Sequence, residues 1–182
     1  MKKTLFLCAL TAIVANEAKA ADIQPYVGAD YVYSMAKITQ STYTDKSFHA
    51  LDVSVGGMLT STIGLELSYQ QSKQNKKTTP VGKIKAEYKA LALDGVYYYS
   101  VLDNVQMLAS GGLGYYEGKA KIKTGTGLIK DDDEHYGVRV GLGAQYNINS
   151  NWAMRMMFRY HYIRADYLKN IKDITIGARY YF

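Results

Sequence analysis

The chain ends in Lys172-Asp173-Ile174-Thr175-Ile176-Gly177-Ala178-Arg179-Tyr180-Tyr181-Phe182. Successive side chains of a strand point to opposite faces, so this segment has one small or polar face and one apolar face, the latter made of Ile174, Ile176, Ala178, Tyr180 and Phe182. In water such a strand would expose a hydrophobic ribbon and unpaired backbone groups. Lipid against the apolar face and pairing around a closed barrel remove both problems. The segment therefore predicts a transmembrane β-strand, with a terminal strand of a soluble sandwich as the alternative.

The other end of the chain has the features of a secretory signal peptide. Lys2 and Lys3 precede an apolar run from Thr4 to Ala15, and Ala18-Lys19-Ala20 is a small-x-small cleavage site. We expect residues 1–20 to be removed and residues 21–182 to form one outer-membrane barrel domain. The single cysteine, Cys8, lies in the signal segment. A lipoprotein box there is disfavoured because the bulky Leu7 occupies a position that requires a small residue.

Alternation of apolar and polar residues recurs eight times after residue 21. The segments lie at about 22–34, 48–59, 63–70, 86–100, 105–115, 136–147, 152–162 and 172–182. The breaks after the second, fourth and sixth segments are short, whereas those at 36–47, 71–85, 117–134 and 163–171 are longer. Short periplasmic turns and longer external loops are typical of an outer-membrane barrel. The pattern predicts an all-β fold, an eight-stranded antiparallel up-and-down transmembrane β-barrel in a Gram-negative outer membrane.

The aromatic residues support the membrane version of this barrel. The chain has 18 tyrosines and only 4 phenylalanines, and tyrosine suits the membrane–water interface. Tyr69, Tyr99, Tyr146, Trp152 and Phe182 stand near predicted strand ends. A soluble lipocalin-like barrel is the alternative, but it would place arginines and acids outside and tyrosine rings in a cavity.

The second half of the chain resembles a known superfamily. The residues that carry the resemblance are Gly137 to Tyr146 (GVRVGLGAQY), Asn151 to Arg155 (NWAMR) and Phe158-Arg159-Tyr160. They are similar to the outer-membrane β-barrel superfamily of the OmpA transmembrane domain, OmpX/Ail-type proteins and opacity-type surface antigens. The ending formed by Ile174, Ile176, Tyr180 and Phe182 resembles the signal that the barrel assembly machinery recognises, which implies that machinery as a partner during insertion.

Eight charged residues have the phase of the inward face. They are Asp30, Asp52, Glu66, Asp94, Arg139, Arg155, Arg159 and Arg179. An eight-stranded barrel is just wide enough to be filled by side chains, and buried charges must be paired. We expect two layers, with Glu66, Arg155 and Arg179 nearer the periplasm and the other five near mid-height. The sequence thus predicts a polar interior without a continuous pore; a narrow ion-conducting channel is the alternative.

Enzymatic and metal sites are poorly supported. Tyr160-His161-Tyr162-Ile163 invites comparison with the His-x-Ser motif of lipid A deacylases, but Ile163 stands where the nucleophilic serine should be. His49 and His135 lie at strand–loop junctions without a Ser and acid beside them. Asp131-Asp132-Asp133-Glu134 lacks the alternating ligands of a calcium loop and fits a solvated acidic loop better. We expect no catalytic residue, cofactor, metal or nucleic-acid partner.

Basic residues gather in two of the predicted external loops. They are Lys73, Lys76, Lys77, Lys83 and Lys85 in the second loop and Lys119, Lys121 and Lys123 in the third. Such lysines above the outer leaflet could pair with lipopolysaccharide phosphates or with an anionic host-surface ligand. They could equally be ordinary solvated residues. The hypothesis is a structural or adhesin-like surface protein that contacts outer-membrane lipid and acts through its loops.

Overall fold

The fold was analysed in a computed structural model, which describes residues 23–38, 47–73, 75–79, 82–124, 127–163 and 168–182. Residues 1–20, the predicted signal peptide, lie outside these ranges. The strands are β1 (Gln24–Ile38), β2 (Ser47–Met58), β3 (Ile63–Ser72), β4 (Asn75–Thr79), β5 (Gly82–Leu102), β6 (Val105–Thr124), β7 (Gly127–Asn147), β8 (Trp152–Ile163) and β9 (Leu168–Tyr181). No helix long and apolar enough to cross a membrane occurs among the described residues.

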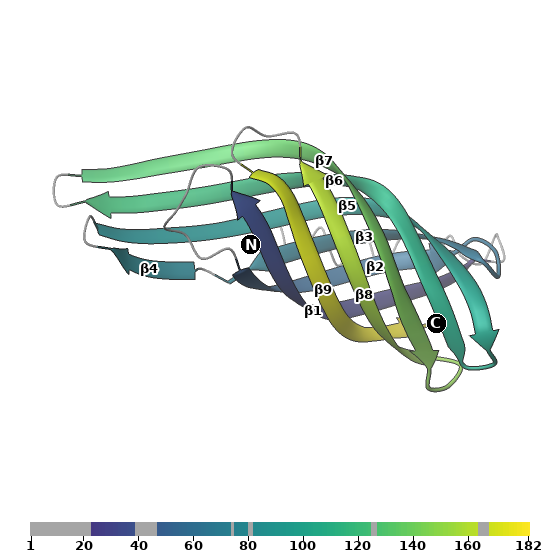
Figure 1. The fold of residues 1–182 in the computed structure, drawn as a ribbon. Coiled ribbons are helices and arrows are strands. Elements are labelled where there is room, and N and C mark those ends of the chain that lie inside the picture. Colours follow the sequence, from purple (N-terminus) through teal and green to yellow (C-terminus); the bar gives the residue numbers. More distant parts are fainter. Residues whose placement is uncertain (1–22, 39–46, 74, 80–81, 125–126, 164–167) are drawn as a thin grey trace.

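Eight of these strands close into an antiparallel barrel, as the sequence predicts. Each strand pairs with the next, β3 pairs with β5, and β9 pairs with β1 (Figure 1). The terminal strand β9 closes the barrel on β1: Val27 lies opposite Tyr180, and Ile176 lies opposite Tyr31. The short strand β4 pairs with β5 outside the closed barrel.

The hydrogen-bond register also fixes the stagger of the barrel. Starting at Asp30, the row of opposed residues that passes through β2, β3, β5 and β6 reaches β7 at His135. The row that passes the other way, through β9 and β8, reaches β7 at Gln145. The offset around the barrel is therefore 145 − 135 = 10 residues. Strands with such a stagger are tilted relative to the barrel axis.

The two faces of the wall follow the predicted alternation. On β8, Trp152, Met154, Met156 and Phe158 are exposed on the outer face, whereas the intervening residues are buried inside. Exposed apolar side chains also cover the outer faces of the other barrel strands. Near the carboxyl terminus the rings of Trp152, Tyr180 and Phe182 meet edge to face, with centroids 5.0 and 5.2 Å apart. This cluster forms part of an aromatic girdle at one end of the barrel.

That end also carries the three short turns and the end of the chain. The turns lie at 59–62, 103–104 and 148–151. In the last one, the Asn149 side-chain oxygen accepts from the N–H groups of Asn151 (2.9 Å) and Trp152 (2.8 Å). The Phe182 N–H donates to the Pro25 carbonyl at 3.0 Å, so the last residue is tied to the first strand. By the short-turn rule this end faces the periplasm.

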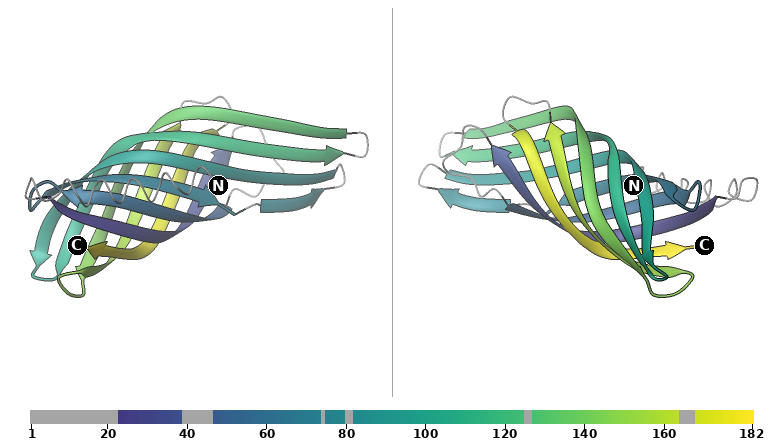
Figure 2. Two further views of the ribbon diagram at one scale, coloured as in Figure 1. Left: turned by 180° about the vertical axis from the view of Figure 1, so that it is seen from behind. Right: turned by 45° about the vertical axis from the view of Figure 1, so that its right-hand side comes forward.

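At the opposite end, the prediction of long irregular loops at 71–85 and 117–134 is wrong. There β4, β5, β6 and β7 continue as a four-stranded sheet that projects beyond the barrel (Figures 1 and 2). Its register aligns Ile84 with Ile122 and Ile122 with Ile129. Cross-strand pairs of β-branched residues stabilise strands, so these segments extend the hairpins instead of leaving them as loops. We call residues 75–79, 82–87, 117–124 and 127–136 the extracellular sheet.

Candidate functional site

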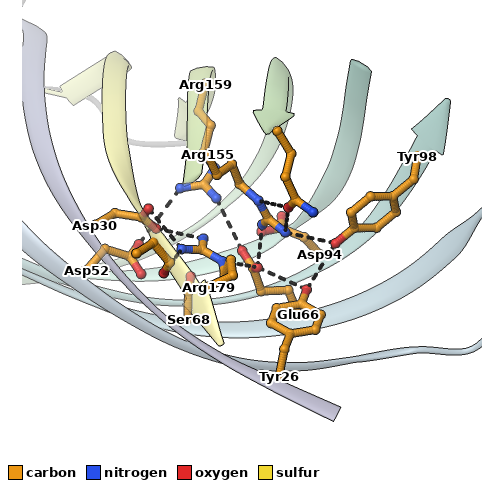
Figure 3. Close-up of polar contacts among 12 residues, drawn as sticks. Tyr26, Asp30, Asp52, Glu66, Ser68, Asp94, Tyr98, Arg155, Arg159 and Arg179 are labelled. Carbon is orange, nitrogen blue, oxygen red and sulfur yellow. Dashed lines mark hydrogen bonds and ion pairs between the residues drawn. The ribbon is translucent and has the colours of Figure 1, made fainter. Parts of the chain in front are cut away.

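The eight predicted interior charges all lie inside the barrel. Each is at most 2% exposed, and Figure 3 shows acids and arginines from different strands pointing toward one another. Charges in so dry a space are stable only when they are paired and hydrogen-bonded. The pairing therefore decides whether the interior is a plug.

Glu66 is the centre of this network. Its carboxylate lies 2.6 Å from Arg155 Nη1, 3.3 Å from Arg159 Nη2 and 3.4 Å from Arg179 Nε. The Tyr26 hydroxyl donates to it at 3.0 Å. The expectation of two separate layers is wrong, because Glu66 joins arginines assigned to both. It also lies directly opposite Asp94, which was assigned to the other layer.

Two arginines make bidentate contacts with carboxylates. Arg179 Nη1 and Nη2 donate to the Asp30 oxygens at 2.9 and 2.7 Å. Arg139 Nε donates to Asp94 Oδ1 at 2.7 Å, its Nη2 contacts Asp94 Oδ2, and the same nitrogen donates to Ser68 at 2.8 Å. The planar guanidinium matches a carboxylate in this geometry. The first pair joins the neighbouring strands β9 and β1, and the second reaches from β7 to β5 and β3.

Glycines on the inner face leave the space that these charged side chains occupy. A Cβ added to Gly112 would strike the Asp94 carboxylate, and one added to Gly177 would strike that of Asp30. A Cβ at Gly28 would lie 2.5 Å from Arg179 Cδ. The inner glycines and the ion pairs are therefore parts of one arrangement.

Asp52 is the least satisfied member. Its nearest cation is Arg159 Nη1 at 3.9 Å, and neither of its oxygens accepts a hydrogen bond within the described part of the chain. It also lies directly opposite Asp30 on the neighbouring strand. The network is thus strong around Glu66 and loose around Asp52.

A second buried cluster, not among the predicted site residues, lies nearer the extracellular end. His161 Nε2 lies 3.1 Å from Asp173 Oδ2, and His161 Nδ1 lies 2.7 Å from the Tyr116 hydroxyl. Gln70 Nε2 donates to Asp173 at 3.2 Å and to the Tyr88 hydroxyl at 2.5 Å. The inward phase of His161 and Asp173 was visible in the sequence, but only the register of β8 against β9 brings them together.

An apolar cluster covers that side of the interior. Its members are Phe48, Tyr88, Ala90, Tyr116, Ile163 and Ile171. Ile163, at the position where a deacylase would have serine, is a buried member, 2% exposed. His161 is thus enclosed among interior side chains. His49, one of the two histidines expected at strand–loop junctions, lies in β2. It is exposed and contacts the Tyr31 hydroxyl.

The periplasmic end of the interior is hollow. A cavity of about 700 Å³ lies between the short turns and is lined largely by amides and hydroxyls. Gln145 lies in its wall and donates to the Tyr181 hydroxyl at 3.0 Å, while Tyr98 accepts from Arg155 at 2.8 Å. The ion network therefore begins where this vestibule ends. Within the described ranges no group of three His, Cys, Asp or Glu residues could hold a metal ion.

The predicted loop lysines are distributed over the extracellular sheet and the end of β3. Lys73 is exposed beyond β3, and its N–H donates to the His49 carbonyl at 2.7 Å. Lys76, Lys77, Lys83, Lys119, Lys121 and Lys123 lie in β4, β5 and β6; their backbones are described, but their side chains lie outside the description. Asp131, Asp132, Asp133 and Glu134 lie in β7, so the expected acidic loop is a strand.

The register gathers most of these lysines on one face. Lys76 is opposite Lys85, Lys85 is opposite Lys121, and Lys121 is opposite Lys130. Lys83 and Lys123 form a second opposed pair on the same face, two positions away. We call Lys76, Lys83, Lys85, Lys121, Lys123 and Lys130 the lysine face. It continues the outer face of the barrel, because Lys83 and Lys85 have the same alternation as the exposed Leu91 and Leu93.

The remaining predicted lysines do not join this row. Lys77 takes the opposite face of β4. Lys119 is on the same face as Lys121, but its opposed residues are the acids Glu87 and Asp132. Lys130 was not among the predicted basic residues. The register of the hairpin around Thr124 and Gly127 was the signal that could have found it, because this register places Lys130 opposite Lys121.

Comparison with known proteins agrees with this architecture. The family model for the outer membrane protein beta-barrel domain matches residues 4–182. The chain therefore belongs to this family, and its place is the outer membrane of a Gram-negative bacterium. No curated protein sequence gave a significant match.

Three solved structures illustrate the shared fold. Neisserial surface protein A is 17% identical, with a TM-score of 0.68 over 87% of this chain and 97% of that chain. Ail, the attachment invasion locus protein of Yersinia pestis, is 18% identical, with a TM-score of 0.64 over 87% and 98%. Ail in complex with the heparin analogue sucrose octasulfate is 19% identical, with a TM-score of 0.64 over 88% and 99%.

Proposed function

We propose that this protein is a surface-interaction barrel whose extracellular sheet binds polyanions through the lysine face. The observation that carries the proposal is the row of four lysines at directly opposed positions on four neighbouring strands, from Lys76 to Lys130. Neighbouring strands lie about 4.8 Å apart. A row of cations at that spacing suits a ligand with closely repeated sulfates, phosphates or carboxylates.

The cost of the row supports a binding role. Like charges directly opposite each other destabilise a sheet, and the barrel does not need this row in order to close. An anionic ligand would offset the repulsion. The Ail structure with a heparin analogue is consistent with a sulfated ligand for a barrel of this fold. Lipopolysaccharide phosphates are a second source of the same anionic chemistry, and outer-membrane lipid surrounds the barrel below.

The test uses the protein in lipid nanodiscs and immobilised heparin. Reversal of the two central charges, K85E/K121E, should weaken binding by at least about tenfold, because both substitutions replace attraction by repulsion. The matched control is K37E/K172E, which makes the same change in net charge on β1 and β9, away from the extracellular sheet. Equal losses in both variants, or no heparin binding by the unaltered protein, would remove this proposal. Nanodiscs with and without lipopolysaccharide distinguish the two anion sources.

The interior supports a plug more than a channel. Glu66 with its three arginines and the Arg139–Asp94 pair cross the lumen. The loose surroundings of Asp52 and the periplasmic vestibule are the observations that favour a narrow channel instead. Single-channel recording of the purified protein decides between them: a plugged barrel gives no stable conductance, whereas a large and steady one would establish the channel.

We also propose that the protein is not an enzyme and that the barrel assembly machinery inserts it. His161 is enclosed, and isoleucine replaces the serine that a lipid A deacylase requires beside it. Release of acyl chains from lipid A by the purified protein would overturn the first statement. The outward placement of Ile174, Ile176 and Phe182 on the last strand supports the second.

A further inference from the structure

Among the described strands, the extracellular sheet has two edges that no neighbouring strand pairs with. On one side β4 pairs only with β5, and on the other side residues 127–136 of β7 pair only with β6 among the described strands. The partner of β7 lower down, β8, ends at Ile163 opposite Gly137. Open strand edges present unpaired N–H and C=O groups that another strand can use.

The two edges carry opposite charges. The edge strand β4 is Asn75-Lys76-Lys77-Thr78-Thr79. The open part of β7 contains Asp131-Asp132-Asp133-Glu134. An edge strand with charges of one sign repels an identical edge, which is a common way to prevent pairing between copies. Two edges of opposite sign on one sheet, however, are complementary to each other in neighbouring molecules.

We propose that the protein associates with further copies of itself in the membrane by pairing β4 of one copy with β7 of the next. The direction of the strands permits it. β4 runs away from the membrane and β7 runs toward it, so two copies with the same orientation present them antiparallel. A copy displaced within the membrane plane then continues the sheet without turning over either face. Such head-to-tail contacts generate an open row.

The stagger of the barrel sets the register of this contact. A row of opposed residues climbs 10 residues outward over the full circle of eight strands. Over the four spacings from β4 to the neighbour's β4 it climbs about 5 residues. Two copies at the same height in the membrane therefore do not place the neighbour's Lys76 opposite Lys130. The neighbour's Lys76 lies about 5 residues nearer the membrane, beside the acids of β7.

Only even offsets keep each residue on its own face of the sheet. The even offset of about four residues places the neighbour's Lys76 opposite Glu134 and its Lys77 opposite Asp133. Thr78 and Thr79 then stand opposite Asp132 and Asp131. Opposite charges at directly opposed positions stabilise antiparallel strands.

The distance between neighbouring copies that this pairing requires is compatible with the diameter of the barrels in the membrane. Four strand spacings of about 4.8 Å at a tilt of about 40° put neighbouring copies about 25 Å apart in the membrane plane. Eight strands with that spacing and tilt enclose a backbone cylinder about 16 Å across. The remaining gap of about 9 Å is close to the distance of about 10 Å at which two sheets pack with interdigitated side chains. Neighbouring barrels therefore fit side by side without a clash or a void.

Cysteine cross-linking in isolated outer membranes tests the register. Residues 21–182 contain no cysteine. In the doubly substituted chain T78C/D132C, the two sulfurs meet only between copies, because about three strand spacings separate them within one chain, beyond the Cα distance of about 7 Å that a disulfide tolerates. Mild oxidation should give a ladder of dimers, trimers and larger species. The control T78C/L128C marks the register without offset and should give none. No ladder from the first chain, or equal ladders from both, would overturn the proposal.

Charge exchange tests the complementarity. In the T78C/D132C background, D133K/E134K should reduce the cross-linked fraction by about tenfold, because two attractive pairs become repulsive. Adding K76E/K77E to the same chain exchanges both edges and should restore the ladder. The control K83E/K123E changes two charges on inner strands of the sheet and should leave the ladder intact, although it weakens the lysine face. Failure of the exchange to restore the ladder, or its loss in the control, would contradict pairing of these edges.

Discussion

Arg179 on the last strand grips Asp30 on the first with two hydrogen bonds, of 2.9 and 2.7 Å. The pair joins residues at opposite ends of the chain across the seam where the barrel closes. Both side chains are at most 1% exposed. The ion pair therefore ties barrel closure to the charge balance of the interior.

Loss of one partner of this pair should destabilise the barrel strongly. Arg179→Met leaves Asp30 uncompensated beside Asp52 and should lower the free energy of unfolding by about 3–5 kcal/mol. The double variant D30N/R179M should recover part of that loss, because residue 30 then no longer carries a buried charge without its partner. Urea titration of the refolded protein in lipid vesicles measures both, and a stability of Arg179→Met equal to that of the unaltered protein would contradict a role for the pair at the seam.

Two adjacent glycines offer a matched comparison. A Cβ at Gly112 would strike the Asp94 carboxylate and the Leu93 carbonyl, whereas a Cβ at Gly111 meets nothing within 4 Å. Gly112→Ala should cost about 1–3 kcal/mol of stability through overpacking. Gly111→Ala on the outer face should change it by less than about 0.5 kcal/mol. Equal unfolding curves for the two variants would show that Asp94 does not depend on the space above Gly112.

The last residue should matter more for assembly than for the finished fold. Phe182 is 62% exposed, and its fixed contacts are one backbone hydrogen bond to Pro25 and the Tyr180 ring. Its deletion should cost the refolded barrel about 1 kcal/mol, yet reduce the amount in the outer membrane several-fold. Phe182→Tyr retains the terminal aromatic ring and should assemble normally. Outer-membrane fractionation alongside heat-modifiable gel migration of refolded protein separates the two effects.

The fold was predictable from the sequence because successive side chains of a barrel strand alternate between the outer apolar face and the interior. Eight apolar faces, short turns after every second strand and the terminal aromatic residue were enough to predict closure. The extracellular sheet was missed because the alternation of lysines with Ala120 and Ile122 spans only the five residues from Lys119 to Lys123, and Asp131 to Glu134 does not alternate at all. Cross-strand partners such as Ile122 and Ile129 reveal it, and these depend on the register of the hairpin.

The interior was predictable in composition but not in pairing. The phase of each strand places Glu66 and Arg155 inside, yet phase does not say which acid meets which base. The pairing of β8 with β9 brings His161 to Asp173. The ten-residue stagger around the barrel brings Arg155, Arg159 and Arg179 to Glu66. It also sets the proposed contact between copies.

The salt dependence of heparin binding tests the proposed function most directly. If the lysine face is the contact, the logarithm of the affinity should fall linearly with the logarithm of salt concentration, with a slope of about −3 to −5 for the unaltered protein in nanodiscs. Removal of two contacts in K85Q/K121Q should reduce the magnitude of that slope by about 2, while K37Q/K172Q should leave it unchanged. A slope that is the same in all three proteins would contradict binding through the lysine face.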